Sequence, residues 1–82
     1  MLQIKSAGDQ MKVPNAISVS VNGQQRSTQS GATVGDLLRE LGLDSGRVAI
    51  ERNLEILPRS LWTATQVADG DRYEIVQFVG GG

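Results

Sequence analysis

The chain has 82 residues, of which 39% are hydrophobic, and it contains neither cysteine nor histidine. This length allows one small domain with a modest core, and the composition excludes disulfides, thiolate nucleophiles and most zinc sites. The net charge of −1, with both signs interspersed, lacks the basic patch of a nucleic-acid-binding protein, so we expect no nucleic-acid partner. The apolar runs are too short to span a membrane or to form a signal peptide, which predicts a cytoplasmic protein without membrane contact.

The first half of the chain begins with an irregular segment and continues with a hairpin. Residues 1–15 show no sustained hydrophobic period, and we expect a flexible N-terminal extension there. Residues 16–21 alternate apolar side chains with serines, which is the period of a half-buried strand. Asn22-Gly23 follows at once and predicts a type I′ turn, because both residues tolerate a positive φ. The polar residues 24–29 then predict a second strand at the edge of the sheet.

A short amphipathic helix is predicted next. Thr33 is a suitable N-cap, and the carboxylate of Asp36 falls in the first turn, where it favours the positive end of the helix. Apolar residues recur with the helical period along one face at Val34, Leu37, Leu38 and Leu41. Gly42 supplies a left-handed C-cap residue, and Leu43 is expected to fold back onto Leu38 in a Schellman motif.

Two further strands are predicted at residues 48–51 and 55–57. The turn between them, residues 52–54, contains no glycine, so we expect a looser loop there than a tight hairpin. Pro58 ends the second of these strands and opens a helical turn. In that turn, Trp62 is expected to anchor the edge of the core.

The last strand is predicted over residues 72–79, after a turn rich in aspartate and glycine. Tyr73 and Ile75 should face one side of this strand, and Val76 and Phe78 the other side. A sheet covered by a helix on one face should not need apolar residues on both sides of a strand. Val76 and Phe78 therefore predict either an outward docking patch or a second face that is covered by loop segments.

The predicted order is strand, strand, helix, strand, strand, helical turn, strand. An antiparallel hairpin, a helix packed across it and a last strand that returns to the middle of the sheet make an α+β domain of the ubiquitin-like β-grasp type. Its mixed sheet should hold about four to five strands, with one main helix packed across them. We expect this domain over residues 16–79, followed by a flexible reactive tail over residues 80–82.

The tail itself is Gly80-Gly81-Gly82. Without side chains, it can be threaded into a channel that is too narrow for any other residue. The main-chain carboxylate of Gly82 is ionised at neutral pH and can act as a weak nucleophile. The alternative interpretation is a frayed glycine-rich end without a function.

Several stretches, in order, carry a resemblance to a known family. They are Val21-Asn22-Gly23, Thr33-Val34-Gly35-Asp36-Leu37-Leu38, residues 48–53, Ile56-Leu57-Pro58-Arg59, Asp69-Gly70-Asp71 and residues 74–82. Through these stretches, the chain resembles the ThiS family of sulfur carrier proteins of thiamine biosynthesis over residues 16–82. Residues 1–15 depart from the usual start of the family, and Leu54 stands where a small turn residue would fit better.

The resemblance implies a protein that is not itself an enzyme and that holds no metal and no stably bound cofactor. An activating enzyme similar to ThiF would use ATP and Mg²⁺ to adenylate Gly82. Sulfur from the persulfide of a donor protein would replace AMP, and the resulting thiocarboxylate would deliver sulfur to a thiazole synthase similar to ThiG. The tail threaded into these partners would be Gly80, Gly81 and Gly82, and the docking surface would be Val76, Phe78 and Val79. A monomer is expected for a carrier that visits two enzymes.

Other classes of protein remain open from the residues. A carrier similar to MoaD would use the same tail to supply sulfur for molybdopterin, and a ubiquitin-like modifier would attach it to lysines. A third possibility is a β-grasp binding module in which the glycines are incidental. An independent enzyme is disfavoured, because the carboxylates have turn and surface positions and no nucleophile–base pair is evident. These carboxylates are Glu51, Glu55, Asp69 and Asp71.

Overall fold

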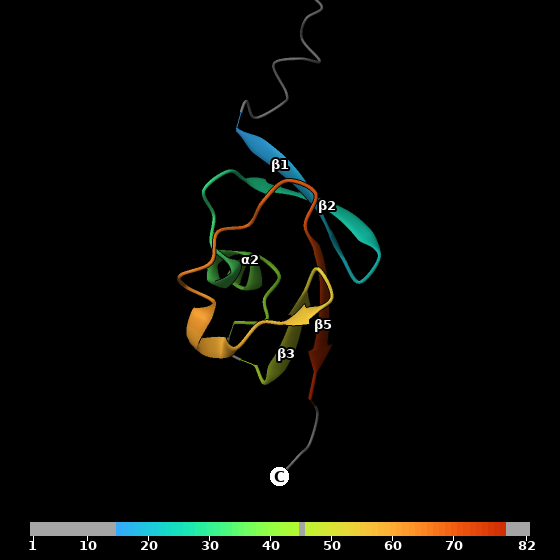
Figure 1. The fold of residues 1–82 in the computed structure, drawn as a ribbon, viewed down its shortest axis with the longest axis vertical. Coiled ribbons are helices and arrows are strands. Elements are labelled where there is room, and N and C mark those ends of the chain that lie inside the picture. The colour runs from blue at the N-terminus through green and yellow to red at the C-terminus, as the bar shows by residue number, and fades with distance from the viewer. Residues whose placement is uncertain (1–14, 45, 79–82) are drawn as a thin grey trace, which may run out of the picture.

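The computed structural model describes residues 15–44 and 46–78. In these ranges the chain forms a five-stranded sheet with a helix across one face (Figure 1). The elements are β1 (Ala16–Val21), β2 (Gln24–Gln29), α2 (Val34–Glu40), β3 (Val48–Arg52), β4 (Glu55–Ile56), the 3-10 helix η1 (Arg59–Leu61) and β5 (Arg72–Gln77). Their order confirms the predicted α+β, ubiquitin-like β-grasp fold.

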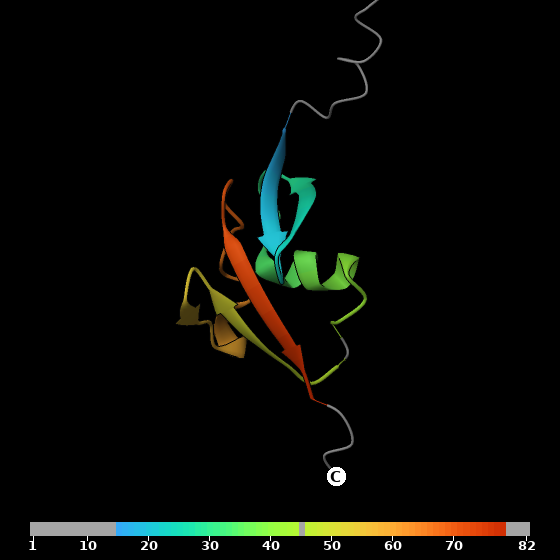
Figure 2. The same ribbon diagram turned by 90° about the vertical axis from the view of Figure 1, so that its right-hand side faces the viewer.

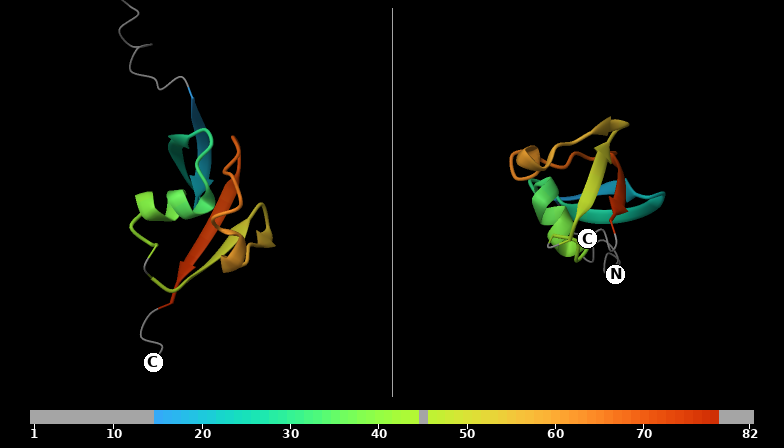
Figure 3. Two further views of the ribbon diagram at one scale, coloured as in Figure 1. Left: turned by 90° about the vertical axis from the view of Figure 1, so that its left-hand side faces the viewer. Right: turned by 90° about the horizontal axis from the view of Figure 1, so that it is seen from below.

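The last strand of the chain lies in the middle of the sheet. The strand order is β2-β1-β5-β3-β4, with β5 parallel to β1 and antiparallel to β3. Figure 2 and the left panel of Figure 3 show β5 between β1 and β3 from opposite sides, with α2 crossing one face. The predicted return of the last strand to the centre of a mixed sheet is therefore confirmed.

The first hairpin forms as its sequence predicts. Val21 and Gln24 are partners in the register of β1 with β2, so Asn22 and Gly23 alone form the turn. Their φ angles of 51° and 86° are those of a type I′ turn. In β2 only Thr28 is buried, as expected for a polar strand at the edge of the sheet.

The helix α2 has the predicted caps at both ends. The N–H of Asp36 donates to Thr33 Oγ1 at 3.1 Å, and Asp36 Oδ2 accepts from the N–H of Thr33 at 2.9 Å, which makes a capping box. At the other end, the N–H of Leu43 donates to the carbonyl oxygen of Leu38 and the N–H of Gly42 to that of Arg39, which is a Schellman motif. The helix therefore begins and ends where its own residues specify.

The second hairpin contradicts the expected loose loop. Arg52 and Glu55 are partners in the register of β3 with β4, so the turn consists of Asn53 and Leu54 alone. Both residues have positive φ, 52° and 74°, as a tight type I′ turn requires. The prediction was wrong because hydrogen bonds from Asn53 to β5, described below, hold the turn without a glycine.

The segment after β4 closes one end of the core. Trp62 is buried, and its Nε1 donates to the carbonyl oxygen of Leu57 at 3.1 Å, while the guanidinium of Arg59 lies 4.9 Å from the centre of its ring. The N–H of Gly35, in the first turn of α2, donates to the carbonyl oxygen of Trp62. Trp62 is thus the predicted core anchor, and the right panel of Figure 3 shows η1 beside α2.

The core lies between α2 and the sheet. Its buried apolar residues are Val19, Val21, Val34, Leu37, Leu38, Val48, Ile50, Trp62, Val67, Tyr73 and Ile75. Trp62 and Val67 come from the segment between η1 and β5, and the others lie on the apolar face of the helix and at alternating positions of β1, β3 and β5. The core holds β5 in place, because the inner side chains of this strand, Tyr73 and Ile75, are buried in it.

Candidate functional site

β5 is hydrogen-bonded to its neighbours up to Phe78. Gln77 lies opposite Val48 in the register with β3, and the N–H of Phe78 donates to the carbonyl oxygen of Arg47 at 2.8 Å. One residue, Val79, separates Phe78 from the predicted tail. The sheet therefore fixes the backbone close to the residues to which the sequence assigns the chemistry.

Part of the predicted site lies outside the described residues. This applies to Val79 of the docking surface, to Gly80, Gly81 and Gly82 of the tail, and to residues 1–14 of the N-terminal extension. The assigned roles of these residues stay predictions. The strand that leads to them ends at Gln77, two residues before its predicted end.

The docking residues Val76 and Phe78 are exposed. Their side chains are 58% and 56% accessible, whereas Tyr73 and Ile75, on the other side of β5, are buried. Among the two predicted arrangements, an outward patch or a face covered by loops, the structure has the outward patch.

The patch is part of a larger surface that we call the outer face, the side of the sheet away from α2. By strand alternation it comprises Ala49, Glu51, Ile56, Arg72, Glu74, Val76 and Phe78. A shallow hollow on it, between β3, β4 and β5, is lined by Ala49, Ile50, Glu51, Ile56, Glu74 and Val76. Ile56 is 68% exposed and was not among the predicted site residues, because the sequence does not show which residues lie opposite each other.

Asn22 holds β5 from the side of β1. Its Nδ2 donates to the carbonyl oxygen of Ile75 at 3.1 Å, and its Oδ1 accepts from the N–H of Ile75 at 2.8 Å. The side chain thereby takes the place of a strand residue beyond the end of β1. The sequence identifies Asn22 as a turn residue but gives no sign of this second contact, which comes from a strand far along the chain.

Asn53 holds β5 from the side of β3 in a similar way. Its N–H donates to the carbonyl oxygen of Arg72 at 2.8 Å, and its Oδ1 accepts from the N–H of Arg72 at 2.9 Å. Its Nδ2 donates to Asp71 Oδ1 at 3.0 Å. Two turns with an asparagine at positive φ therefore fix the start and the middle of the strand that leads toward the tail.

Asp71 is buried at the start of β5 among four donors. Its Oδ2 accepts from the N–H of Ala68 at 2.9 Å, from Arg52 Nε at 3.0 Å and from the hydroxyl of Tyr73 at 2.8 Å, and Asn53 binds its Oδ1. Burial alone would raise the pKa of Asp71, but the hydrogen bonds from these donors lower it below its ordinary value. An ionised carboxylate with its acceptors in use is a structural group, not a general base.

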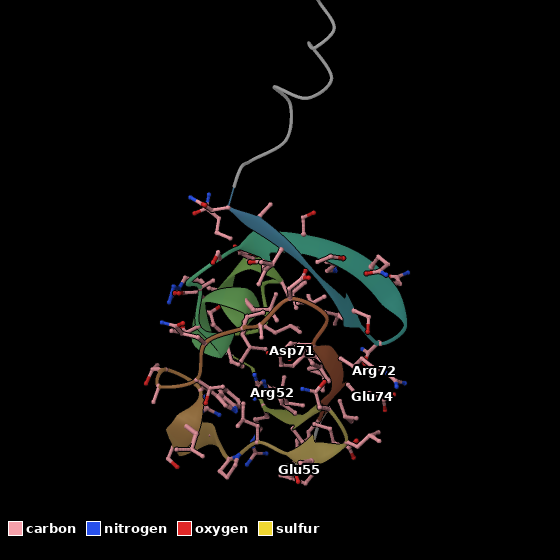
Figure 4. The ribbon with its side chains drawn as sticks, turned by 45° about the horizontal axis from the view of Figure 1, so that its top comes forward. Arg52, Glu55, Asp71, Arg72 and Glu74 are labelled. Carbon is pink, nitrogen blue, oxygen red and sulfur yellow. The ribbon has the colours of Figure 1, made fainter. Side chains whose placement is uncertain are left out.

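Tyr73 shares this environment from the core side. Burial, together with the hydrogen bond to Asp71, raises the pKa of Tyr73 to about 12. In Figure 4, Arg52 and Asp71 lie on one side of β5, whereas Arg72 and Glu74 lie on the other side. The Asp71 cluster therefore belongs to the interior, whereas Arg72 and Glu74 belong to the opposite, outer side of β5 (Figure 4).

The described residues have few other candidate sites. In the ranges 15–44 and 46–78, no group of three or more potential ligands (His, Cys, Asp or Glu) is placed to hold a metal ion. In the same ranges, no helix is long and apolar enough to cross a membrane. The outer face offers apolar side chains, two carboxylates and the guanidinium of Arg72.

The fold and this surface define a ubiquitin-like β-grasp domain with an exposed sheet face beside its central strand. The sequence profile of the ThiS family matches residues 19–82, which is most of the chain. The chain belongs to the ThiS family.

Its relatives differ in length. It is 53% identical over 62 residues to a thiazole synthase of Paramagnetospirillum magneticum, an alignment that covers 76% of this chain and 19% of the relative. The chain thus spans about a fifth of the length of the thiazole synthases it matches. It is also 32% identical to the sulfur carrier protein ThiS of Escherichia coli, over 80% of this chain and all of the relative.

A solved structure agrees with this assignment. The crystal structure of the thiamine biosynthesis protein ThiS from Geobacter metallireducens superposes with a TM-score of 0.64 at 38% sequence identity. The superposition covers 80% of this chain and 100% of that chain. The β-grasp fold predicted from the sequence is therefore the fold of a known ThiS protein.

Proposed function

We propose that this chain is a sulfur carrier of thiamine biosynthesis and that Gly82 is the residue that carries the sulfur. The observation that supports this most directly is the ThiS family match, which runs through the glycine tail to residue 82. The alignment with the whole of a short sulfur carrier adds to that support. The thiazole synthases among the relatives favour a thiazole precursor over molybdopterin as the acceptor.

The chemistry begins with activation, because a carboxylate has too poor a leaving group to donate its acyl group. An oxygen of Gly82 attacks the α-phosphate of ATP on an adenylating enzyme, which forms the acyl adenylate and releases pyrophosphate. A persulfide of a donor protein then displaces AMP, and a thiol cleaves the resulting acyl disulfide to leave the thiocarboxylate. This chain supplies the acyl group, and its partners supply ATP, Mg²⁺ and sulfur.

The geometry of β5 bears on how the tail reaches its partner. Four residues beyond Phe78 extend at most about 13–14 Å, at roughly 3.3–3.6 Å each. Because the sheet fixes the backbone up to Phe78, the enzyme that reacts with Gly82 must also contact the body of the domain near this point. Val76 and Phe78 are the exposed apolar side chains beside it.

Intact-mass measurement tests this proposal. The chain is incubated with ATP, Mg²⁺, a sulfur source and an adenylating enzyme of the ThiF type, and the product should gain the mass difference between sulfur and oxygen. A variant that lacks Gly82 should show no gain, whereas Glu40→Gln, an exposed position on α2 outside the tail, should still react. An unchanged mass of the wild type, with an enzyme that loads another carrier, would contradict the proposal.

The same measurement on protein isolated from its natural source is also needed. The proposal requires Gly82 to have a free carboxylate in the working protein. A natural polypeptide that continues past Gly82 without cleavage would contradict it.

A further inference from the structure

Two carboxylates lie directly opposite each other on the outer face. Glu51 and Glu74 are partners in the register of β3 with β5. The Cβ atoms of such a pair are about 4.5–5.5 Å apart, and like charges in these positions destabilise a sheet. The ion pairs of the described residues lie on α2 and in the Asp71 cluster, so none of them neutralises either glutamate.

One cation, Arg72, lies on the same side of β5 as Glu74 (Figure 4). Arg72 precedes Glu74 on the same side of β5, and Figure 4 shows both residues on the side away from Asp71. It forms no ion pair among the described residues. No cation of the described residues therefore forms an ion pair with Glu51 or Glu74.

Apolar side chains border the two carboxylates. Ile56 lies opposite Glu51 in the register with β4, and Val76 lies opposite Ala49 in the register with β5. Ile56 and Val76 are 68% and 58% exposed and line the same hollow as the glutamates. A ligand that fits this surface has an apolar stem and a cationic head, which is the construction of a long basic side chain.

We propose that this hollow receives an arginine side chain of the adenylating enzyme that acts on Gly82. The guanidinium binds Glu51 and Glu74 together, and the stem of the arginine lies over Ile56 and Val76. Arginine is favoured over lysine because its planar head carries five donors, can serve two carboxylates at once and is more weakly hydrated.

The inference rests on the proposed function, and the position of the hollow connects the two. Glu74 on β5 and Phe78, directly after the end of this strand, are about 13 Å apart, at roughly 3.3 Å per residue. A protein interface of ordinary size covers about 800 Å² on each partner. An enzyme that contacts β5 near Phe78 in order to hold the tail therefore covers the hollow as well.

Calorimetric titration of the unmodified chain into the adenylating enzyme of the same organism tests this proposal, because binding is measured without sulfur transfer. The double variant Glu51→Gln/Glu74→Gln should raise Kd by about tenfold or more. The matched control is Glu40→Gln/Asp44→Asn, which changes the net charge equally at exposed positions on α2 and shortly after it, outside the hollow. Its Kd should stay within about twofold of the wild type, since distant exposed charges are largely screened.

Thermal unfolding of the free variants separates a binding effect from misfolding. Without the partner, Glu51→Gln/Glu74→Gln should unfold at the wild-type temperature or above, because the substitutions remove a repulsion. Added salt should bring the affinities of the wild type and this variant closer together.

The possible outcomes separate the two proposals. Equal Kd values for both double variants would overturn the arginine site, even if the wild type is converted to the thiocarboxylate. A tenfold loss confined to the Glu51/Glu74 variant, with no sulfur gained by the wild type, would support the arginine site and overturn the sulfur-carrier proposal. Failure of the wild type to bind the enzyme would overturn both.

Discussion

Replacement of Leu54 by glycine should stabilise the protein, although Leu54→Gly removes a large apolar side chain. Leu54 has a φ of 74° and is 76% exposed, so it occupies left-handed backbone and buries little surface. Left-handed backbone costs a residue with a Cβ roughly 1–2 kcal/mol, and glycine avoids this cost. Glycine also loses more chain entropy on folding, by about 0.5–1 kcal/mol. The balance is a gain of about 0.5–1 kcal/mol in the free energy of unfolding.

Thermal unfolding followed by circular dichroism measures this gain. For a domain of this size, 1 kcal/mol shifts Tm by about 4–8 °C, so Leu54→Gly should raise Tm by several degrees. The control is Leu54→Ala, which removes nearly the same apolar surface but keeps the Cβ and its strain. The reasoning is refuted if Leu54→Gly is no more stable than Leu54→Ala, because the difference between these variants isolates the backbone cost.

Three further predictions concern the contacts that hold β5. Asn22→Ala should lower the free energy of unfolding by about 2–3 kcal/mol, because the main-chain groups of Ile75 lose their partners. The control is Asn22→Gly, which keeps the positive φ but lacks the side chain. If chemical denaturation shows Asn22→Gly to be as stable as the wild type, the hydrogen bonds of the Asn22 side chain are not the cause of the loss. Asp71 has a lowered pKa, so its contribution to stability is present above the unfolded-state pKa near 3.8 and is lost as the pH falls through the folded-state pKa. Acid unfolding curves should show this loss in the wild type and not in Asp71→Asn. Equal curves for the two proteins would contradict the prediction. The raised pKa of Tyr73 has the opposite sign: its stabilisation is complete below pH 10 and is lost as the pH rises toward about 12, a loss of order 2–3 kcal/mol that should be absent in Tyr73→Phe. An alkaline limb that persists in Tyr73→Phe would assign it to another group.

The sequence by itself determined the local elements and their order. Capping residues and a Gly C-cap specified α2, and Asn22-Gly23 specified the first turn, because each signal acts through neighbours within a few residues. Alternation identified the buried side of β5 and left Val76 and Phe78 on the other side. The order of elements then sufficed to predict the β-grasp fold, since few arrangements bury one helix face and one sheet face together.

The tertiary structure alone decided the contacts between strands that are distant in the chain. The register of β3 with β5 places Glu51 opposite Glu74, and the hydrogen bonds of Asn53 to Arg72 close a tight turn that contains Leu54. The assembled sheet also leaves Val76 exposed on the outer face. These features depend on how separate segments align when the core side chains pack, and packing across the sheet is not encoded within any one segment. For that reason the elements could be derived from the residues, whereas the surface that a partner meets could only be seen once they had assembled.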